Sequence, residues 1–142
     1  MKTETGNGKD QLTDETRANM KVLSSAMLRL HKTLLDAEKL EYEAINGPIT
    51  SVNIYFQLVI DDPHFAWLRK LSSLIALIDE AVSVRRPATE SEAQALFSEA
   101  RLLLEFGDPD EDFNDKFQTA LQRNPDAVIG HNDARAVAAH AK

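Results

Sequence analysis

The chain has 142 residues, no cysteine and a formal net charge of −7. This length fits one domain that buries a real hydrophobic core. The absence of cysteine excludes disulfides, zinc–thiolate sites and cysteine nucleophiles, and it is consistent with a reducing compartment.

The negative charge is concentrated in residues 87–126, where ten side chains are acidic and three are basic. An acidic segment repels phosphate, and the chain has no basic face of the kind that binds nucleic acid. The apolar runs are far shorter than the roughly 20 residues of a membrane span, and the polar start MKTETGNGKD lacks the apolar part of a secretory signal. We therefore expect a cytoplasmic protein without nucleic-acid or membrane partners.

Residues 1–12 are predicted to be a disordered tail, because they are rich in polar residues. A long first helix then begins after Thr13, a good N-cap, and ends at Asn46-Gly47-Pro48. Its length of about 50 Å would overhang a small bundle and so favours a partner. Apolar residues recur at a spacing of three or four and form one predicted buried stripe: Met20, Leu23, Met27, Leu30, Leu34 and Ala37.

Residues 49–60 fit two structures. Ile49, Val52, Phe56 and Val59 have helical spacing, but several residues of this segment also favour strands. Because no second strand-like run exists to pair with it, the sequence favours a helix.

A third helix is predicted to open at Asp62-Pro63, with Asp as N-cap and Pro at the first helical position, and to end at Arg85-Arg86-Pro87. Its apolar residues cover about 200° of the circumference, more than a surface helix requires. We therefore expect this helix to be the central one.

Thr89 to Glu92 form a capping box that starts a fourth helix, which ends at Gly107. A fifth helix is predicted to start at Asp108-Pro109-Asp110-Glu111, which is close to a capping box with Asp in place of Ser or Thr, and to close at Asn124-Pro125. Residues 125–142 are predicted to be a C-terminal tail that is partly helical. The sequence thus predicts an all-α fold, in which residues 13–124 form a single-domain bundle of four to five helices.

Catalytic motifs are missing. The chain has five glycines and no nucleotide-binding glycine-rich loop, GxSxG or HExxH. We therefore predict no catalytic residue, no metal and no cofactor, and a non-enzymatic protein is favoured over an enzyme.

Three polar residues of the first helix stand near its apolar stripe: His31, Glu38 and Tyr42. His31 and Glu38 are about 10.5 Å apart along the helix axis, too far to share one metal ion easily. Glu38 and Tyr42 are four residues apart and could form a hydrogen bond. The simpler interpretation is that these groups lie at the edge of the stripe and reach solvent.

Asp79 falls between Ile75 and Val82 on the apolar arc of the third helix. A buried carboxylate needs a partner, for which Arg69, Arg101, His31 or a helix N-terminus are candidates. The favoured interpretation is a structural hydrogen bond that fixes helix register, and the alternative is a ligand-binding role.

Two further residues have competing interpretations. Trp67, with Tyr55 and Phe56, could line a small pocket, although aromatic residues at helical spacing are more often part of a core. His131 lies in the weakly structured C-terminal segment, where a histidine is usually solvated.

The run Asp62-Pro63-His64-Phe65-Ala66-Trp67-Leu68-Arg69-Lys70-Leu71-Ser72 resembles a segment of uncharacterised bacterial helical proteins with the pattern DPxFAWLRxLSxLIxxID. The resemblance extends over most of residues 31–131. It implies an all-α fold and no known activity. It also includes the positions His31, Glu38, Trp67, Arg69, Asp79 and His131.

Two functions follow as hypotheses. The first is a non-enzymatic interaction or regulatory module that binds a protein partner or a second copy of itself as a homodimer. The second is a small-molecule- or metal-binding bundle with an internal histidine and carboxylate cluster. That cluster would contain His31, Glu38, Tyr42, Arg69 and Asp79, with His131 folded over it.

Overall fold

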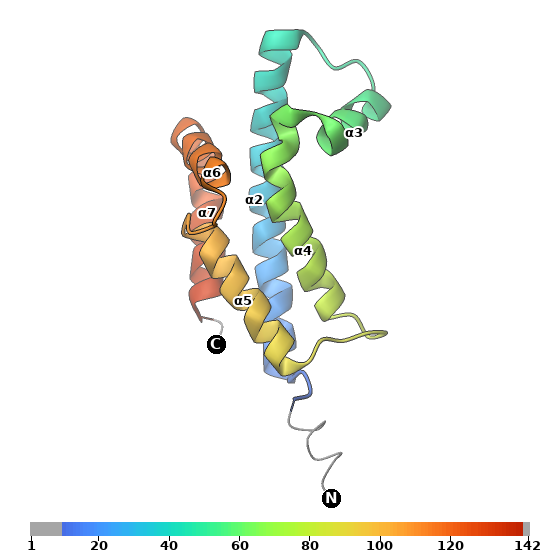
Figure 1. Ribbon diagram of the computed structural model, residues 1–142, viewed down its shortest axis with the longest axis vertical. Coiled ribbons are helices and arrows are strands. Elements are labelled where there is room, and N and C mark those ends of the chain that lie inside the picture. The colour runs from blue at the N-terminus through green and yellow to red at the C-terminus, as the bar shows by residue number, and fades with distance from the viewer. Residues whose placement is uncertain (1–9, 141–142) are drawn as a thin grey trace, which may run out of the picture.

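The computed structural model describes residues 10–140, and over this range the protein is all-α. Figure 1 shows one long helix along the molecule, with the other helices arranged around it. The all-α architecture with a long first helix is confirmed, and the sixth α-helix lies beyond the four to five that the sequence predicts. The elements are α2 (Asp14–Asn46), α3 (Val52–Asp61), the 3₁₀ helix η1 (Pro63–Leu68), α4 (Arg69–Ala81), α5 (Glu90–Leu104), α6 (Glu111–Arg123) and α7 (Pro125–His140).

The central element is α2, which packs against η1, α4, α5 and α7. The prediction that the third helix is central is therefore wrong. The wide apolar arc of α4 faces α2 on one side, but its other side is left partly open, and Leu77 is 53% exposed there. The predicted stripe of α2 is confirmed for five of its members, which are fully buried: Met20, Leu23, Met27, Leu30 and Leu34.

Hydrogen bonds connect the residues just before α2 to the start of α5. The backbone N–H of Glu90 donates to the carbonyl oxygen of Asp10 at 2.9 Å, and the Ser91 hydroxyl donates to the Asp10 carboxylate at 2.8 Å. Asp10, which the prediction includes in the tail, thus pairs with α5, and residues 1–9 of that tail lie outside the described range. The predicted N-cap at Thr13 and the capping box at Thr89 are both present.

The uncertain segment after α2 is the helix α3, which Ser51 caps at its N-terminus. Gly47 ends α2 with a φ of 89°, a conformation that glycine adopts without strain, and its N–H donates to the Glu43 carbonyl oxygen. The chain then turns back, so that α3 stands beside the bundle and packs chiefly against η1 (Figure 1). No residue of α3 is buried.

The predicted third helix is divided into two parts. Asp62 accepts a hydrogen bond from the His64 N–H at 2.8 Å and starts η1 as predicted, and α4 continues from η1 but ends at Ala81. The chain folds back after α4, since the Ala88 N–H donates to the Ala81 carbonyl oxygen at 2.9 Å.

The segment predicted as a partly helical tail is the helix α7, which packs along α2. Ala127, Ala134 and Ala138 are buried, and the first two share a helix face with Gly130. A Cβ atom on Gly130 would lie 3.4 Å from the Cα of Leu30, so small side chains allow the two helices to approach closely. Within residues 10–140, no helix has both the length and the apolar character needed to cross a membrane.

Candidate functional site

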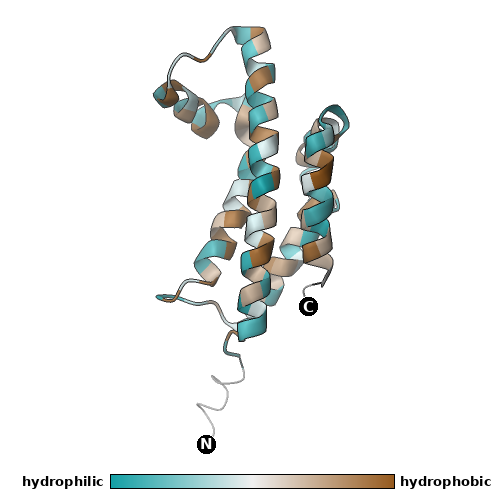
Figure 2. Ribbon diagram, turned by 180° about the vertical axis from the view of Figure 1, so that it is seen from behind, coloured by the Kyte–Doolittle hydropathy of each residue, from teal (hydrophilic) through white to brown (hydrophobic). Residues whose placement is uncertain are grey.

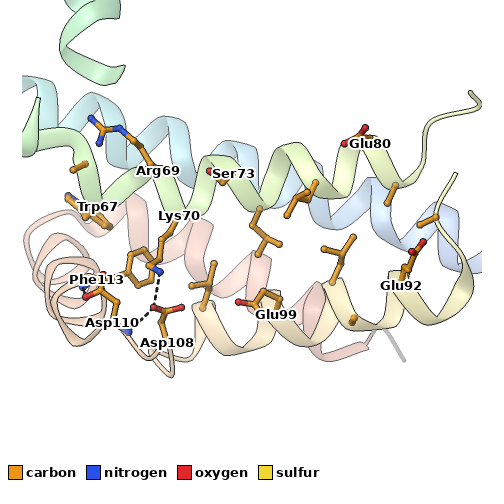
Figure 3. A pocket seen from close by; sticks show the side chains of 18 of the residues that line it. Trp67, Arg69, Lys70, Ser73, Glu80, Glu92, Glu99, Asp108, Asp110 and Phe113 are labelled. Carbon is orange, nitrogen blue, oxygen red and sulfur yellow. Dashed lines mark hydrogen bonds and ion pairs between the residues drawn. The ribbon is translucent and has the colours of Figure 1, made fainter. Parts of the chain in front are cut away.

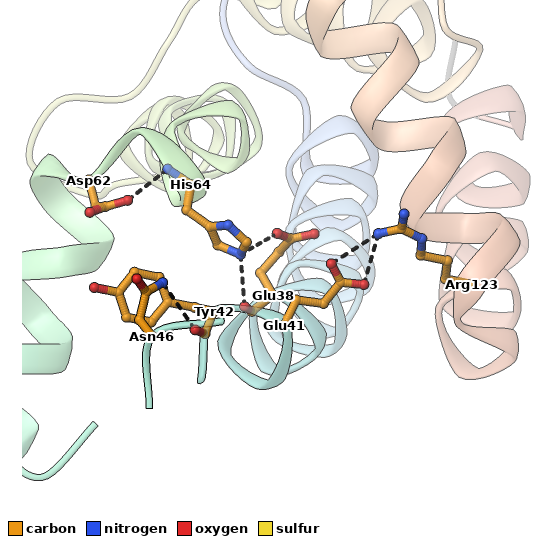
Figure 4. Close-up of polar contacts among 7 residues, drawn as sticks. All are labelled: Glu38, Glu41, Tyr42, Asn46, Asp62, His64 and Arg123. Atoms are coloured by element: carbon orange, nitrogen blue, oxygen red, sulfur yellow. Dashed lines mark hydrogen bonds and ion pairs between the residues drawn. The ribbon is translucent and has the colours of Figure 1, made fainter. Parts of the chain in front are cut away.

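A half-buried pair of Glu38 and His64 joins α2 to η1 (Figure 4). The Oε1 atom of Glu38 lies 2.9 Å from Nε2 of His64, and the same Nε2 lies 3.0 Å from the Glu38 carbonyl oxygen. The two side chains are 15% and 23% exposed. Both oxygens accept from Nε2, so the imidazole carries a proton on that nitrogen.

Glu38 has a second hydrogen-bond donor, because the Trp67 side chain also bonds to its carboxylate. Burial raises the pKa of Glu38, and the neighbouring charge of Glu41 acts in the same direction. The charges of His64 and Arg123 and the Trp67 hydrogen bond oppose this rise. The environment thus disfavours the ionised carboxylate, even though two donors surround it.

Aromatic rings enclose the pair. Tyr42 lies edge-on to His64 with ring centres 5.6 Å apart, and its ring centre is 5.7 Å from that of Phe65. The predicted hydrogen bond between Glu38 and Tyr42 is not formed; Tyr42 makes ring contacts instead. We refer to these residues as the Glu38 cluster: Glu38, Tyr42, His64, Phe65 and Trp67.

The Glu38 cluster contains three of the predicted site residues and two that sequence reasoning did not select, His64 and Phe65. Glu38 and Tyr42 share His64 as a partner, and Trp67 joins them through Glu38. The sequence places His64 at a helix start, and Asp62 does fix its backbone there. The His64 imidazole points at Glu38 because η1 packs against α2, and the sequence does not reveal this contact.

Two other predicted residues lie outside this cluster. The Arg69 guanidinium donates to the carbonyl oxygens of Val59 at 3.4 Å and Asp62 at 3.3 Å, so it ties the end of α3 to the start of α4. His31 is half-buried on α2, and its imidazole makes no hydrogen bond or ion pair with any described residue. Burial lowers the pKa of His31.

The prediction that Asp79 is a buried carboxylate is wrong, since this residue is exposed. Its carboxylate accepts a hydrogen bond from the hydroxyl of the buried Ser24 on α2. A structural hydrogen bond between helices is therefore present, but its partner is none of the four candidates considered. Asp79 lies at the edge of the apolar arc of α4. The buried face predicted from the sequence is therefore wider than the face that the structure buries.

His131 is buried on α7 instead of being solvated in a tail. Its Nε2 donates to the Leu104 carbonyl oxygen at 2.7 Å, and its ring centre is 5.3 Å from those of Phe106 and Phe117. Burial lowers the pKa of His131, and the hydrogen bond to Leu104 opposes this effect. His131 thus belongs to an aromatic group between α5, α6 and α7, which adjoins the Glu38 cluster because the ring centres of Phe117 and Trp67 are 6.1 Å apart.

The six residues proposed as one internal cluster are therefore distributed over several places. In residues 10–140 no group of three or more His, Asp or Glu side chains is arranged to hold a metal ion.

A second feature, which the sequence did not indicate, is a groove of about 1160 Å³ between α4 and α5. At one end, Lys70 lies 3.2 Å from the buried carboxylate of Asp108. The same carboxylate accepts the N–H of Asp110 at 2.9 Å, which orders the loop before α6.

The fold and these two features define an all-α helical bundle with a half-buried Glu–His pair and an open groove. No protein-family model, curated protein or solved structure matches the chain. The resemblance to bacterial helical proteins accordingly stays a prediction.

Proposed function

We propose that this protein is a non-enzymatic interaction module of the cytoplasm, which binds another polypeptide through α3. One observation carries the proposal: α3 is apolar over about two thirds of its circumference, but the bundle covers only one side of it. A helix that is apolar nearly all round is typically buried on all sides.

The contact with η1 uses only the middle of the apolar surface of α3. Tyr55, Leu58 and Val59 are partly buried and pack against the core. Val52 and Phe56, which flank this contact, remain 82% and 63% exposed. Figure 2 shows that much of α3 carries the hydrophobic colour. A partner that covered this flank would remove a large apolar surface from water.

Apolar side chains are also exposed near the end of α2, the helix that precedes α3 in the chain. Leu40 and Ile45 are 69% and 77% exposed there. Single exposed apolar residues are ordinary, but a concentration of them indicates an interaction surface.

The alternative function, ligand or metal binding at an internal polar cluster, has less support. The Glu38 carboxylate already accepts hydrogen bonds from two side chains of the protein, His64 and Trp67. His31, Asp79 and His131 lie away from it and have other environments.

A photoreactive amino acid at position 56, introduced in the native cells, tests the proposal. We expect a discrete, saturable adduct with a polypeptide, which disappears when Val52 is replaced by Asp. Ile129 on α7 provides a matched control, because it is 64% exposed, like Phe56. Equal labelling from positions 56 and 129, or no adduct from position 56, contradicts the proposal.

A further inference from the structure

We infer that the apolar ridge of α3 docks into the groove between α4 and α5 of a second copy of the chain. In a twofold dimer each copy would donate its α3 to the other. This inference rests on the proposed function, because it names the partner of the α3 surface.

The ridge consists of Val52, Phe56 and Ile60, which are four residues apart. Side chains at this spacing lie on one face of a helix. All three are exposed, and the row is about 12 Å long. A row of this kind is what an amphipathic helix inserts into a hydrophobic groove.

The groove offers two apolar walls (Figure 3). One wall comes from α4 and the other from α5, and each extends for about 10–12 Å along its helix. The ridge and the groove are thus similar in length. The walls contain Leu74, Leu77 and Ala81 from α4, and Ala95, Leu96 and Leu103 from α5.

Charge favours α3 over a charged partner helix. The groove carries both signs, with Lys70, Arg86 and Glu80 on the α4 side and Glu92 and Glu99 on the α5 side. Lys70 and Arg86 are already paired, with Asp108 and Glu80, so a helix that carried charges into the groove would meet like charges or compete with these ion pairs. Residues 48–60 contain no charged side chain in a chain that is 27% charged, and Asp61, the last residue of α3, lies about 140° around the helix from Phe56. The α3 ridge therefore enters the groove without burying an unpaired charge.

The available area suits a reversible dimer. The three ridge side chains expose roughly 300 Å², so two ridges and two grooves would bury on the order of 1,200 Å², the lower limit of a standard stable interface. Pairing α3 directly with a second α3 would cover the ridges but leave both grooves open.

Sedimentation equilibrium across a dilution series tests the dimer. We expect the average mass to rise from one chain to two with concentration. Phe56→Asp on the ridge and Leu77→Asp in the groove should each weaken association at least about tenfold. Ile129→Asp, a control at an exposed site on α7, should leave it unchanged. A chain that is monomeric at every concentration overturns the inference.

Cross-linking identifies the surfaces in contact, because the natural chain has no cysteine. A mixture of Val52→Cys and Leu77→Cys chains, treated with a short bifunctional maleimide, should yield a covalent dimer that joins the two positions. Cross-links only between two Val52→Cys chains overturn docking into the groove. A monomeric chain whose position 56 still labels another protein overturns self-docking and supports the proposed function.

Discussion

Glu38 is a carboxylate that the folded chain holds largely out of water. Its partners His64 and Trp67 both come from η1, the segment that follows α3. A half-buried acceptor of this kind contributes little net stability while it is paired, but losing it leaves the Trp67 donor unpaired and leaves His64 with only the backbone carbonyl oxygen. The pair therefore matters chiefly for holding η1 in place on α2.

Replacement of Glu38 by Ala should lower the free energy of unfolding by about 1–3 kcal/mol, because Trp67 loses its acceptor and His64 keeps only the carbonyl oxygen of residue 38. Glu38→Gln keeps an acceptor oxygen and should retain more than half of that stability. Urea unfolding followed by fluorescence measures the effect, since Trp67 is the one tryptophan of the chain.

Glu41→Ala provides the matched control on the same helix. It removes the exposed ion pair with Arg123, whose atoms are 2.8 Å apart, and should cost at most about 1 kcal/mol. If Glu38→Ala costs no more than Glu41→Ala, the Glu38 cluster has no structural role.

Among the elements, α7 is the one whose importance is hardest to see in the sequence. Its buried residues are mainly alanines, so its hydrophobic and polar faces differ little. Small side chains nevertheless permit a close approach, because Gly130 lies against the backbone of α2 at Leu30. The stability of this contact depends on fit, since dispersion forces decrease steeply with separation.

An enlarged side chain should therefore be tolerated on one face of α7 only. Ala134→Leu places three extra carbons against α2 and should destabilise the fold by about 1–3 kcal/mol through overpacking. Ala136→Leu, at an exposed position of the same helix, should change stability by less than about 0.5 kcal/mol. Thermal unfolding of the two variants measures this difference, and equal melting temperatures would show that α7 does not pack tightly on α2.

For the whole molecule, the burial of two histidines predicts sensitivity to acid. Burial lowers the pKa of both His31 and His131 in the folded state. The unfolded chain takes up their protons below about pH 6.5, before the folded chain does. Their contribution to stability is therefore complete above that pH and is lost as the pH falls below it. The raised pKa of Glu38 acts in the opposite direction.

Urea midpoints near pH 7.5 and near pH 5.5 test this expectation. The natural chain should lose stability at the lower pH. His131→Gln, which keeps a donor for the Leu104 carbonyl oxygen, should lose less. The nearby charges of Arg135 and Glu105 remain in both chains and largely oppose each other. An identical loss in both chains would show that His131 does not contribute to the acid sensitivity.

The sequence by itself determined most of the helices, several of their caps and the buried stripe of α2. These features depend on local contacts: a hydroxyl or carboxylate reaches the N–H groups two or three residues later, and 100° per residue places Met20, Leu23 and Met27 on one face. The local pattern also resolved residues 49–60 as a helix.

The tertiary structure alone decided how the helix faces meet. Helical periodicity gives a direction for each side chain but not the element that it will contact, so the pairing of Glu38 with His64, 26 residues away, could not be read from spacing. Asp79 turned outward because it stands at the edge of its arc, where a small rotation of the helix changes burial into exposure. The close packing of α7 and the open groove beside α5 likewise follow from the distances between helices, which depend on all the side chains in the contact together.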